Sequence, residues 1–205
     1  MTIEAPKPVR SFLAIEVSPE VRQRIGRIQE RLGMYLKGIR WTRPEGIHLT
    51  LKFFGDIYER DLAAIAGAVE GRAAAESPVH LRAGGLGAFP NPDRARVLWI
   101  GLEGDLERLS RLQRDLDDAL ERLGYPREKR SFKPHLTLGR ARGERILGVQ
   151  DVLRKGETHQ AGFFEAGALI LFRSELKPGG AVYTKMAGFP FLGSGGETTA
   201  GTGKE

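Results

Sequence analysis

Short runs of apolar residues, alternating or continuous, recur along most of this chain and are typical of β-strands. These runs predict strands at 10–17, 47–54, 79–89, 94–101, 135–140, 160–172 and 181–188. A shorter stretch at 39–42 leads into the turn-forming segment 43–46, which predicts a hairpin or a return to the same sheet. The Pro- and Asn-containing segment 90–93 predicts a tight connection between strands 79–89 and 94–101.

Other segments show the 3.6-residue spacing of helices. The apolar stripe Val21, Ile25, Ile28 and Leu32 predicts a helix from about residue 19 to 37, ended by Gly38. A second stripe consists of the leucines at 106, 109, 112, 116, 120 and 123. It predicts a helix over 105–123, and weaker patterns predict helices over 60–72 and 144–155.

Strands and helices mix without a regular alternation, so the pattern predicts an α+β fold with antiparallel sheets. We expect residues 1–192 to form a single domain, and the Gly- and Thr-rich segment 193–205 to be a flexible tail. The glycine signatures of dinucleotide-binding folds and of P-loops are both missing from the sequence, which argues against these nucleotide cofactors.

Composition narrows the function further. The chain has 205 residues, a net charge of +6 and no cysteine, which excludes thiolate chemistry and disulfides and weakly favours a polyanionic partner. No apolar run reaches the roughly 18 residues that a membrane span requires, and residues 1–10 lack the apolar stretch of a secretory signal. We therefore expect a cytoplasmic protein with no membrane partner.

The motif that carries chemistry is a repeated tetrapeptide, His-Leu-Thr-Leu. It begins at His48 and again at His135. Positions i and i+2 of a strand share a face. Each copy should therefore present its His and its Thr (Thr50 or Thr137) on one side and bury two leucines on the other. A lone His in a strand is more often structural than catalytic, but the repetition favours a paired site.

Two imidazoles suit the opening of a cyclic phosphate, because one can take a proton from water while the other gives one to the departing ribose oxygen. Threonine hydroxyls beside them can donate hydrogen bonds to the phosphate oxygens. Arg140, five residues after His135, can reach the phosphate if the strand twists or bulges. Arg130 and Lys133 are further cationic candidates, although loop charges are usually only solvated. His80 and His159 stand outside any such motif, and we expect them to be structural.

On these residues the chain resembles the 2H phosphoesterases, and within them the LigT-like RNA 2',3'-cyclic phosphodiesterases, once called 2'-5' RNA ligases. The resemblance covers nearly the whole chain. It rests on Arg10-Ser-Phe-Leu-Ala-Ile, Arg40-Trp41, His48-Leu-Thr-Leu-Lys-Phe-Phe-Gly55, Gly87-Ala-Phe-Pro90, Val97-Leu-Trp-Ile100 and Phe132-Lys-Pro-His-Leu-Thr-Leu-Gly-Arg140.

The resemblance implies two pseudo-symmetric lobes around a cleft, no metal or cofactor, and hydrolysis of RNA 2',3'-cyclic phosphate ends to 2'-phosphates. It implies that His48 protonates the 3' oxygen, that His135 activates water, and that Thr50, Thr137 and Arg140 hold the phosphate. It also implies weak ATP-independent 2'-5' ligation and a monomer without an obligate protein partner.

A base can stack on Phe53 or on Phe54, one of which must be core. Two alternatives remain open for the chain as a whole. One is a non-catalytic RNA-binding module that uses a basic cleft. The other is a metal-dependent phosphodiesterase, which is disfavoured because no Asp or Glu cluster accompanies either His at ligand spacing.

Overall fold

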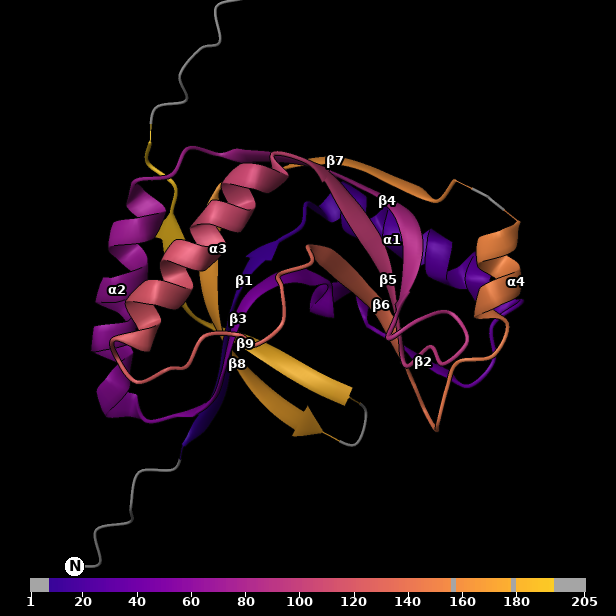
Figure 1. Ribbon diagram of the computed structural model, residues 1–205, viewed down its shortest axis with the longest axis horizontal. Helices are drawn as coiled ribbons and strands as arrows, with labels where there is room; N and C mark the ends of the chain where they lie inside the picture. The colour runs from indigo at the N-terminus through magenta and orange to yellow at the C-terminus, as the bar shows by residue number, and fades with distance from the viewer. Residues whose placement is uncertain (1–7, 156–157, 178–179, 194–205) are drawn as a thin grey trace, which may run out of the picture.

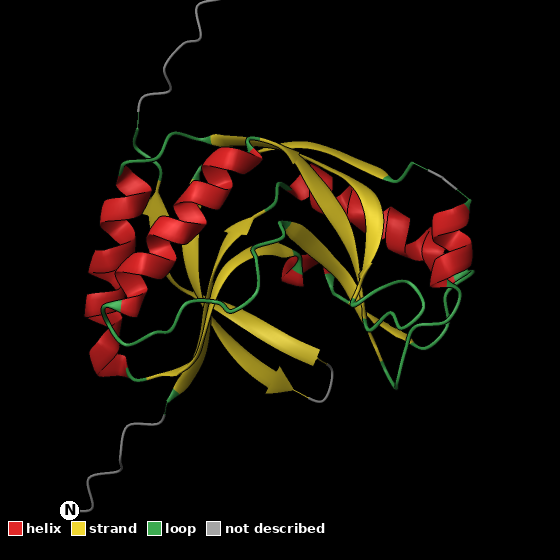
Figure 2. Ribbon diagram, viewed as in Figure 1, coloured by secondary structure: helices red, strands yellow, loops and turns green. Residues whose placement is uncertain are grey.

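A computed structural model describes residues 8–155, 158–177 and 180–193 of the chain. Within these ranges the strands form two antiparallel sheets that lie next to each other, with helices on their outer sides (Figures 1 and 2). This is the α+β, two-lobed architecture that the sequence predicts. Each described helix is too short or too polar to span a bilayer.

The first sheet has four strands in the order β3-β1-β8-β9, and the second has five in the order β2-β6-β5-β4-β7. In the first sheet they are β3 (His48–Ile57), β1 (Val9–Glu16), β8 (Ala168–Lys177) and β9 (Gly180–Pro190). In the second sheet they are β2 (Ile39–Trp41), β6 (His135–Ala141), β5 (Val97–Gly104), β4 (Val79–Phe89) and β7 (Gln160–Ala166).

The helices divide between the two sheets. Those described are α1 (Pro19–Gly33), α2 (Leu62–Ala74), α3 (Leu106–Glu121) and α4 (Val149–Arg154), with short 3-10 turns η1 (Pro44–Gly46) and η2 (Glu59–Asp61). Helices α2 and α3 pack together and contact β9 and β3 respectively, whereas α1 contacts β7 and α4 contacts β4 (Figure 1).

The two lobes repeat one arrangement and exchange strands. Each motif strand, β3 or β6, lies beside a strand from its own half of the chain, β1 or β5. The strand on the far side of β1 or β5 comes from the other half of the chain: β8 pairs with β1 in the first sheet, and β4 pairs with β5 in the second. Neither sheet is therefore complete without both halves of the chain.

The apolar stripes seen in the sequence form the core. Val21, Ile25, Ile28 and Leu32 of α1 are at most 2% exposed. The leucines 109, 112, 116 and 120 of α3 are at most 1% exposed, whereas Leu123, beyond the end of the helix, is 40% exposed. Burial of such side chains contributes on the order of 1.5–3 kcal/mol each, so these stripes hold the helices to the sheets.

Three of the expected elements differ most from the observed bounds. Helix α1 ends at Gly33 and not near 37, because the amides of Met34 and Tyr35 bond to carbonyls only three residues back and tighten the last turn. Helix α4 begins at Val149 and not at 144, because Gly148 before it adopts a left-handed conformation with φ of 86°.

The segment 160–172, expected to be one strand, is two. It breaks at Gly167, where the chain leaves the five-stranded sheet as β7 and enters the four-stranded sheet as β8. Continuous apolar character hides this change of sheet, because both strands bury residues. At the C-terminal end, the amide of Gly193 bonds to the carbonyl of Glu76. The rest of the expected tail, 194–205, lies outside the described residues.

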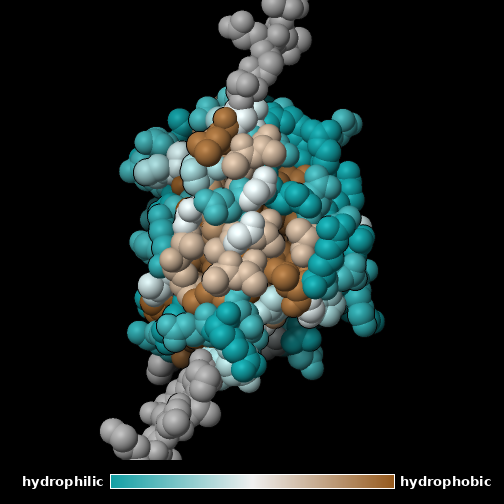
Figure 3. Space-filling model, turned by 90° about the vertical axis from the view of Figure 1, so that its left-hand side faces the viewer, coloured by the Kyte–Doolittle hydropathy of each residue, from teal (hydrophilic) through white to brown (hydrophobic). Residues whose placement is uncertain are grey.

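Helix α2 differs from α1 and α3 in having small residues on its outer side. Ile65, Val69 and Ala73 face inward and are fully buried. Its exposed residues include Ala63 and Gly67. Figure 3 views the molecule from the side of α2 and α3, and it shows a tan, mildly apolar area bordered by hydrophilic residues.

Gly67→Ala should raise the free energy of unfolding by about 0.5–1 kcal/mol, because glycine inside a helix carries excess conformational entropy in the unfolded chain. A Cβ at this exposed position would meet no atom within 4 Å. Urea unfolding of the two proteins measures the difference. Gly87→Ala is the contrasting variant, because its Cβ would collide with the Trp99 ring, and it should lower stability. Equal effects of the two substitutions would contradict this account of α2.

Candidate active site

The two His-Leu-Thr-Leu copies begin the neighbouring strands β3 and β6 and fold in the same way. Leu49, Leu51, Leu136 and Leu138 are at most 3% exposed. The His and Thr of each copy are half-buried on the opposite face. The alternation expected from the sequence is therefore present in both strands, and contacts between β3 and β6 bring the two copies together.

A β-bulge follows in each strand, at the second leucine of the motif. In β3, Lys52 pairs with Leu13 and Thr50 with Ala14, so Leu51 has no partner in the register. In β6, Gly139 pairs with Leu98 and Thr137 with Trp99, so Leu138 has none. An extra residue in one strand shifts the later side chains to the other face. The shift returns position +5 after each His, Phe53 or Arg140, to the cleft side.

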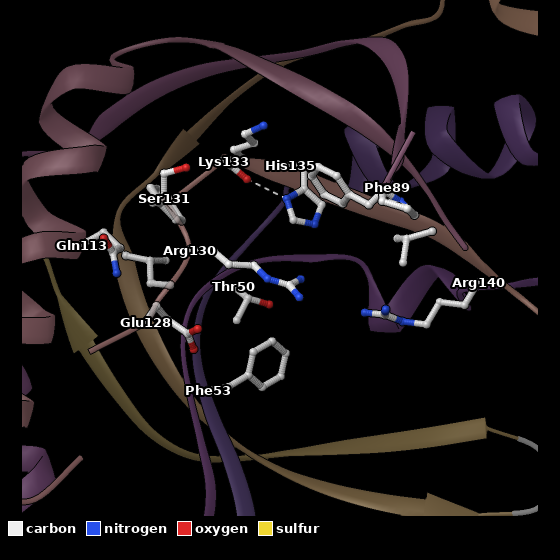
Figure 4. A pocket seen from close by; sticks show the side chains of 14 residues that line it. Thr50, Phe53, Phe89, Gln113, Glu128, Arg130, Ser131, Lys133, His135 and Arg140 are labelled. Atoms are coloured by element: carbon white, nitrogen blue, oxygen red, sulfur yellow. Dashed lines mark hydrogen bonds between the residues drawn. The ribbon is translucent and has the colours of Figure 1, made fainter. Parts of the chain in front are cut away.

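This side faces a cavity of about 630 Å³ between the lobes, drawn in Figure 4. Six of the residues proposed from sequence line it: Thr50, Phe53, Arg130, Lys133, His135 and Arg140. Its other lining residues are Leu51, Phe89, Pro90, Val97, Gln113, Glu128, Ser131 and Phe132. In Figure 4 the guanidinium groups of Arg130 and Arg140 point into this space from opposite sides, and Thr50 lies beside Arg130.

His135 is held at one wall of the cavity. Its Nδ1 lies 2.6 Å from the carbonyl oxygen of Lys133, which requires Nδ1 to be the donor and leaves Nε2 for the cavity (Figure 4). The ring of Phe89 meets the imidazole edge-on at 5.0 Å, and the Trp99 ring lies 6.1 Å away. These contacts fix the orientation of the imidazole before any substrate binds.

His48 is held in a matching way but in a more apolar setting. Its ring stacks on Phe12 with 4.6 Å between centroids, and Tyr183 meets it edge-on at 5.2 Å. A hydrogen bond to the backbone of Gly46 raises the pKa of the imidazole. Because an acceptor favours the protonated ring, the Gly46 group must be its carbonyl, and the His48 ring is the donor. Each histidine thus bonds to the carbonyl two residues before it, Gly46 or Lys133.

Burial makes both imidazoles weaker bases than a free histidine. The pKa of His48 falls from 6.5 to about 4, mainly through burial; the Gly46 hydrogen bond opposes the fall, and the nearby charges of Arg140 and His135 add to it. Burial also lowers the pKa of His135, assisted by Arg140 and opposed by the Lys133 carbonyl. The charge of Arg140 therefore acts on both rings, which places the two imidazoles and this guanidinium around one space.

Of the other predicted residues, some point into the cavity and some do not. Phe53 is 50% exposed in the cavity, whereas Phe54 packs edge-on against Tyr125 at 5.2 Å, so Phe54 is the core member of the pair. The ammonium of Lys133 points away from the cavity in Figure 4. His48 and Thr137 are not among the lining residues, and they lie on the strands beside it.

The two remaining histidines lie outside the cavity. His159 is 3% exposed, in agreement with a structural position. The His80 side chain is 72% exposed, with ring nitrogens 3.7 Å from Asp105 and 3.4 Å from Glu165. Neither belongs to the paired site.

Sequence reasoning did not find the aromatic residues that surround the imidazoles, Phe12, Tyr183 and Phe89. Their strands were predicted, but each aromatic residue lies far from its histidine in sequence and reaches it only through the pairing and packing of strands. Glu128 in the cavity was also missed, since it appeared as one more charge in a basic loop. A predicted strand register could have identified the aromatic neighbours, whereas the loop position of Glu128 gives no such signal.

A buried ion pair anchors the loop that precedes His135. The Nζ of Lys52 lies 2.6 Å from Oδ1 of Asp117 and also donates to the carbonyl of Pro126. The other Asp117 oxygen accepts from Nε2 of Gln113 at 2.8 Å and from the backbone amide of Glu128 at 3.4 Å. Strand β3, helix α3 and the start of the loop are thereby joined, which positions Arg130.

The described side chains do not form a metal site. Within residues 8–155, 158–177 and 180–193, no three His, Asp or Glu side chains gather closely enough to hold an ion. The cavity lining instead includes donors suited to phosphate oxygens, the guanidinium groups of Arg130 and Arg140 and the hydroxyl of Thr50.

Comparison with known proteins identifies the class of this fold and site. The model of the LigT like phosphoesterase family matches the chain twice, over residues 15–99 and 100–183, so each match contains one motif. The chain belongs to this family, the 2H phosphoesterases.

Named relatives align over nearly their whole length. The chain is 36% identical to an RNA 2',3'-cyclic phosphodiesterase of Methanothermobacter thermautotrophicus, covering 88% of this chain and 98% of that protein. It is 34% identical to the protein of the same name from Archaeoglobus fulgidus, covering 88% and 99%. A solved structure from Thermus thermophilus superposes with a TM-score of 0.76 at 29% identity, covering 91% and 100%.

The buried imidazole of His48 should make folding sensitive to acid. Its folded pKa of about 4 lies below the ordinary 6.5, so the unfolded chain binds the proton first as pH falls. Stability should therefore drop between pH 6.5 and 4, by roughly 3 kcal/mol for this group alone. Urea unfolding at pH 7, 5.5 and 4.5 should show a weaker pH dependence in His48→Gln than in the wild type. His80→Gln is the control, and identical slopes in all three proteins would refute the assignment.

Proposed function

We propose that the chain is a hydrolase that opens 2',3'-cyclic phosphates at RNA ends, giving 2'-phosphates without a metal or cofactor. The observation that carries this proposal is the pair of imidazoles, one from each His-x-Thr copy, oriented by matching carbonyls and coupled through Arg140. The activity in the names of the aligned relatives supports the same reaction.

In the proposed step, Nε2 of His135 takes a proton from a water molecule, whose oxygen attacks the phosphorus. The bond from phosphorus to the 3' oxygen breaks, and protonated His48 gives its proton to that oxygen. The phosphate remains on the 2' oxygen, and each imidazole ends in the protonation state in which the other began. Proton exchange with solvent restores the pair.

Negative charge grows on the nonbridging oxygens as water adds to the phosphorus. Thr50 and Thr137 donate hydroxyl hydrogen bonds there, and the Arg140 guanidinium supplies a planar fork of donors. All three stand on the cleft side of the motif strands, Arg140 because of the bulge at Leu138. They are held by the sheets, so little reorganisation is needed during the reaction.

The negative charge of the substrate favours protonation of His48, the proposed acid. In the empty site both imidazoles are neutral near pH 7, because burial lowers both pKa values. A phosphate monoanion raises them, and most strongly at His48, because a charge acts with less screening in its apolar surroundings. His48 thus gains its proton with the substrate, while the more accessible His135 meets the attacking water.

The residues five positions after each motif histidine, Phe53 and Arg140, differ in kind, so the substrate can bind the pseudo-symmetric site in only one orientation. Phe53 presents an exposed ring on which the terminal base stacks, a contact worth roughly 1–3 kcal/mol, and Arg140 occupies the corresponding place on the phosphate side. Arg130, pointing into the cavity, neutralises the phosphate from the loop. By microscopic reversibility the site also supports weak ATP-independent 2'-5' ligation.

The chief competing function is a non-catalytic RNA-binding module. Guanidinium and hydroxyl groups suffice for binding, so that function gives no reason for two oriented imidazoles with lowered pKa values. The cytoplasmic location and the monomeric state, without an obligate protein partner, remain proposals that rest on the sequence and the resemblance.

His48→Ala and His135→Ala should each lower turnover of nucleoside 2',3'-cyclic phosphates by at least about 10²-fold, because each removes one proton-transfer group. Excess chelator should leave wild-type turnover unchanged. Product analysis by chromatography should show the 2'-phosphate. His80→Ala, at an exposed histidine outside the cavity, is the control and should retain activity. Turnover that survives loss of either motif histidine, or that stops on chelation, would contradict the proposal.

The pH profile provides a second test. The productive free enzyme has one protonated and one neutral imidazole, and both pKa values lie below 6.5. Therefore kcat/KM should peak below pH 6.5 and fall about tenfold per unit at higher pH, as the acid loses its proton. Because the bound anion raises both pKa values, the kcat profile should be displaced to higher pH. A kcat/KM that rises towards pH 8 would exclude this protonation scheme.

A further inference from the structure

Two arginines face each other at the edge of the cleft. Strand β2 pairs with β6 so that Arg40 lies directly opposite Arg140, and both are exposed. Opposite residues of an antiparallel pair share a face, and like charges at such positions are destabilising. Neither guanidinium forms an ion pair with a carboxylate in the part of the chain that the structure describes. An arrangement that costs stability and lacks a protein counter-ion suits an anionic ligand.

A second hollow, of about 140 Å³, lies at this pair. Its lining residues are Arg40, Trp41, Thr42, Arg43, Gly46, Arg140, Gly180, Ala181 and Tyr183. No Asp or Glu is among them. Arg140 lines the catalytic cavity as well, so the two spaces meet at this side chain. Tyr183, another residue of this hollow, also lies next to the paired histidines, because its ring meets His48 edge-on at 5.2 Å.

We propose that this hollow binds the phosphodiester that precedes the terminal nucleotide of the RNA, with Arg40 as its principal ligand. The inference rests on the proposed function, because it extends the same substrate by one phosphate. The enzyme would then act on cyclic ends that carry a 5' phosphate in preference to free nucleoside cyclic phosphates.

The shared arginine explains why the ligand is the adjacent phosphate of the same strand. Successive phosphates of RNA are separated by one ribose, and Arg140 can contact the reacting phosphate while Arg40 and Arg43 face the next one. The guanidinium fork matches two phosphate oxygens. Trp41 and Tyr183 supply ring surfaces against which the intervening ribose can lie.

The opposite end of the cleft offers a less suitable path. There a groove of about 380 Å³ runs between α3 and the loop 127–132, and its cations alternate with Asp117, Asp118 and Glu128. Arg127 in this groove is already paired, 2.8 Å from Asp118 and 2.8 Å from Glu121. Its charge is thus largely satisfied within the protein, in contrast to the arginines at β2 and β6.

The decisive experiment compares adenosine 2',3'-cyclic phosphate with the same nucleotide carrying a 5' phosphate. In the wild type the added phosphate should raise kcat/KM by roughly tenfold or more, as expected of hydrogen bonds to a charged group. In Arg40→Ala this ratio should fall towards one, and Arg40→Lys should restore part of it, because lysine keeps the charge without the fork. Arg72→Ala, at an exposed arginine of α2, is the matched control and should keep the wild-type ratio.

Each alternative outcome has a definite meaning. This inference alone would be overturned if the wild type turned over both nucleotides with the same kcat/KM. It would also be overturned if Arg40→Ala kept the wild-type ratio of the two kcat/KM values. A ratio lost in Arg130→Ala but kept in Arg40→Ala would place the preceding phosphate at the loop and would overturn it as well. Absence of turnover with either nucleotide would overturn the proposed function and this inference together. Thermal unfolding checks the fold, and Arg40→Ala should melt no lower than the wild type, since it relieves the repulsion from Arg140.

Discussion

The site depends on two β-bulges, one at Leu51 and one at Leu138. Strict alternation after the motif would turn Phe53 and Arg140 towards the core, where a guanidinium would be costly. The bulges allow each strand to bury both leucines and still direct the His, the Thr and the +5 residue into the cleft. Packing of the core and placement of the reactive groups are thereby satisfied by the same short stretch of each strand.

The surroundings of the imidazoles then determine their chemistry. Phe12 and Tyr183 enclose His48, and Phe89 flanks His135, so both rings lose solvation and their pKa values fall. Carbonyl groups of Gly46 and Lys133 oppose this effect and fix the ring orientations. The balance leaves an uncharged pair in the empty cleft, beside arginines that attract phosphate. The imidazoles therefore gain their charge when an anionic ligand binds beside them, which suits a reaction on a phosphate monoanion.

Much of this could be predicted from the sequence, because its signals are local. The leucines of α3 define a helix by their spacing, and the repeated tetrapeptide defines the paired site at His48 and His135. Other features depend on which strands become neighbours. The break at Gly167 is hidden because β7 and β8 are both apolar, although they enter different sheets. The pairing of Arg40 with Arg140, and the stacking of Phe12 on His48, follow from strand register, which alternation in one sequence does not specify.

The exchange of β4 and β8 between the sheets also restricts how the cleft can move. Because of this exchange, the chain passes between the two sheets at several points, such as β1 to β2, β3 to β4 and β7 to β8, and the lobes are not joined by a single connecting segment. A wide hinge opening would have to displace all of these connections together. Entry and exit of a long RNA should therefore rely more on side chains and surface loops than on a change in the spacing between the two histidine-bearing strands.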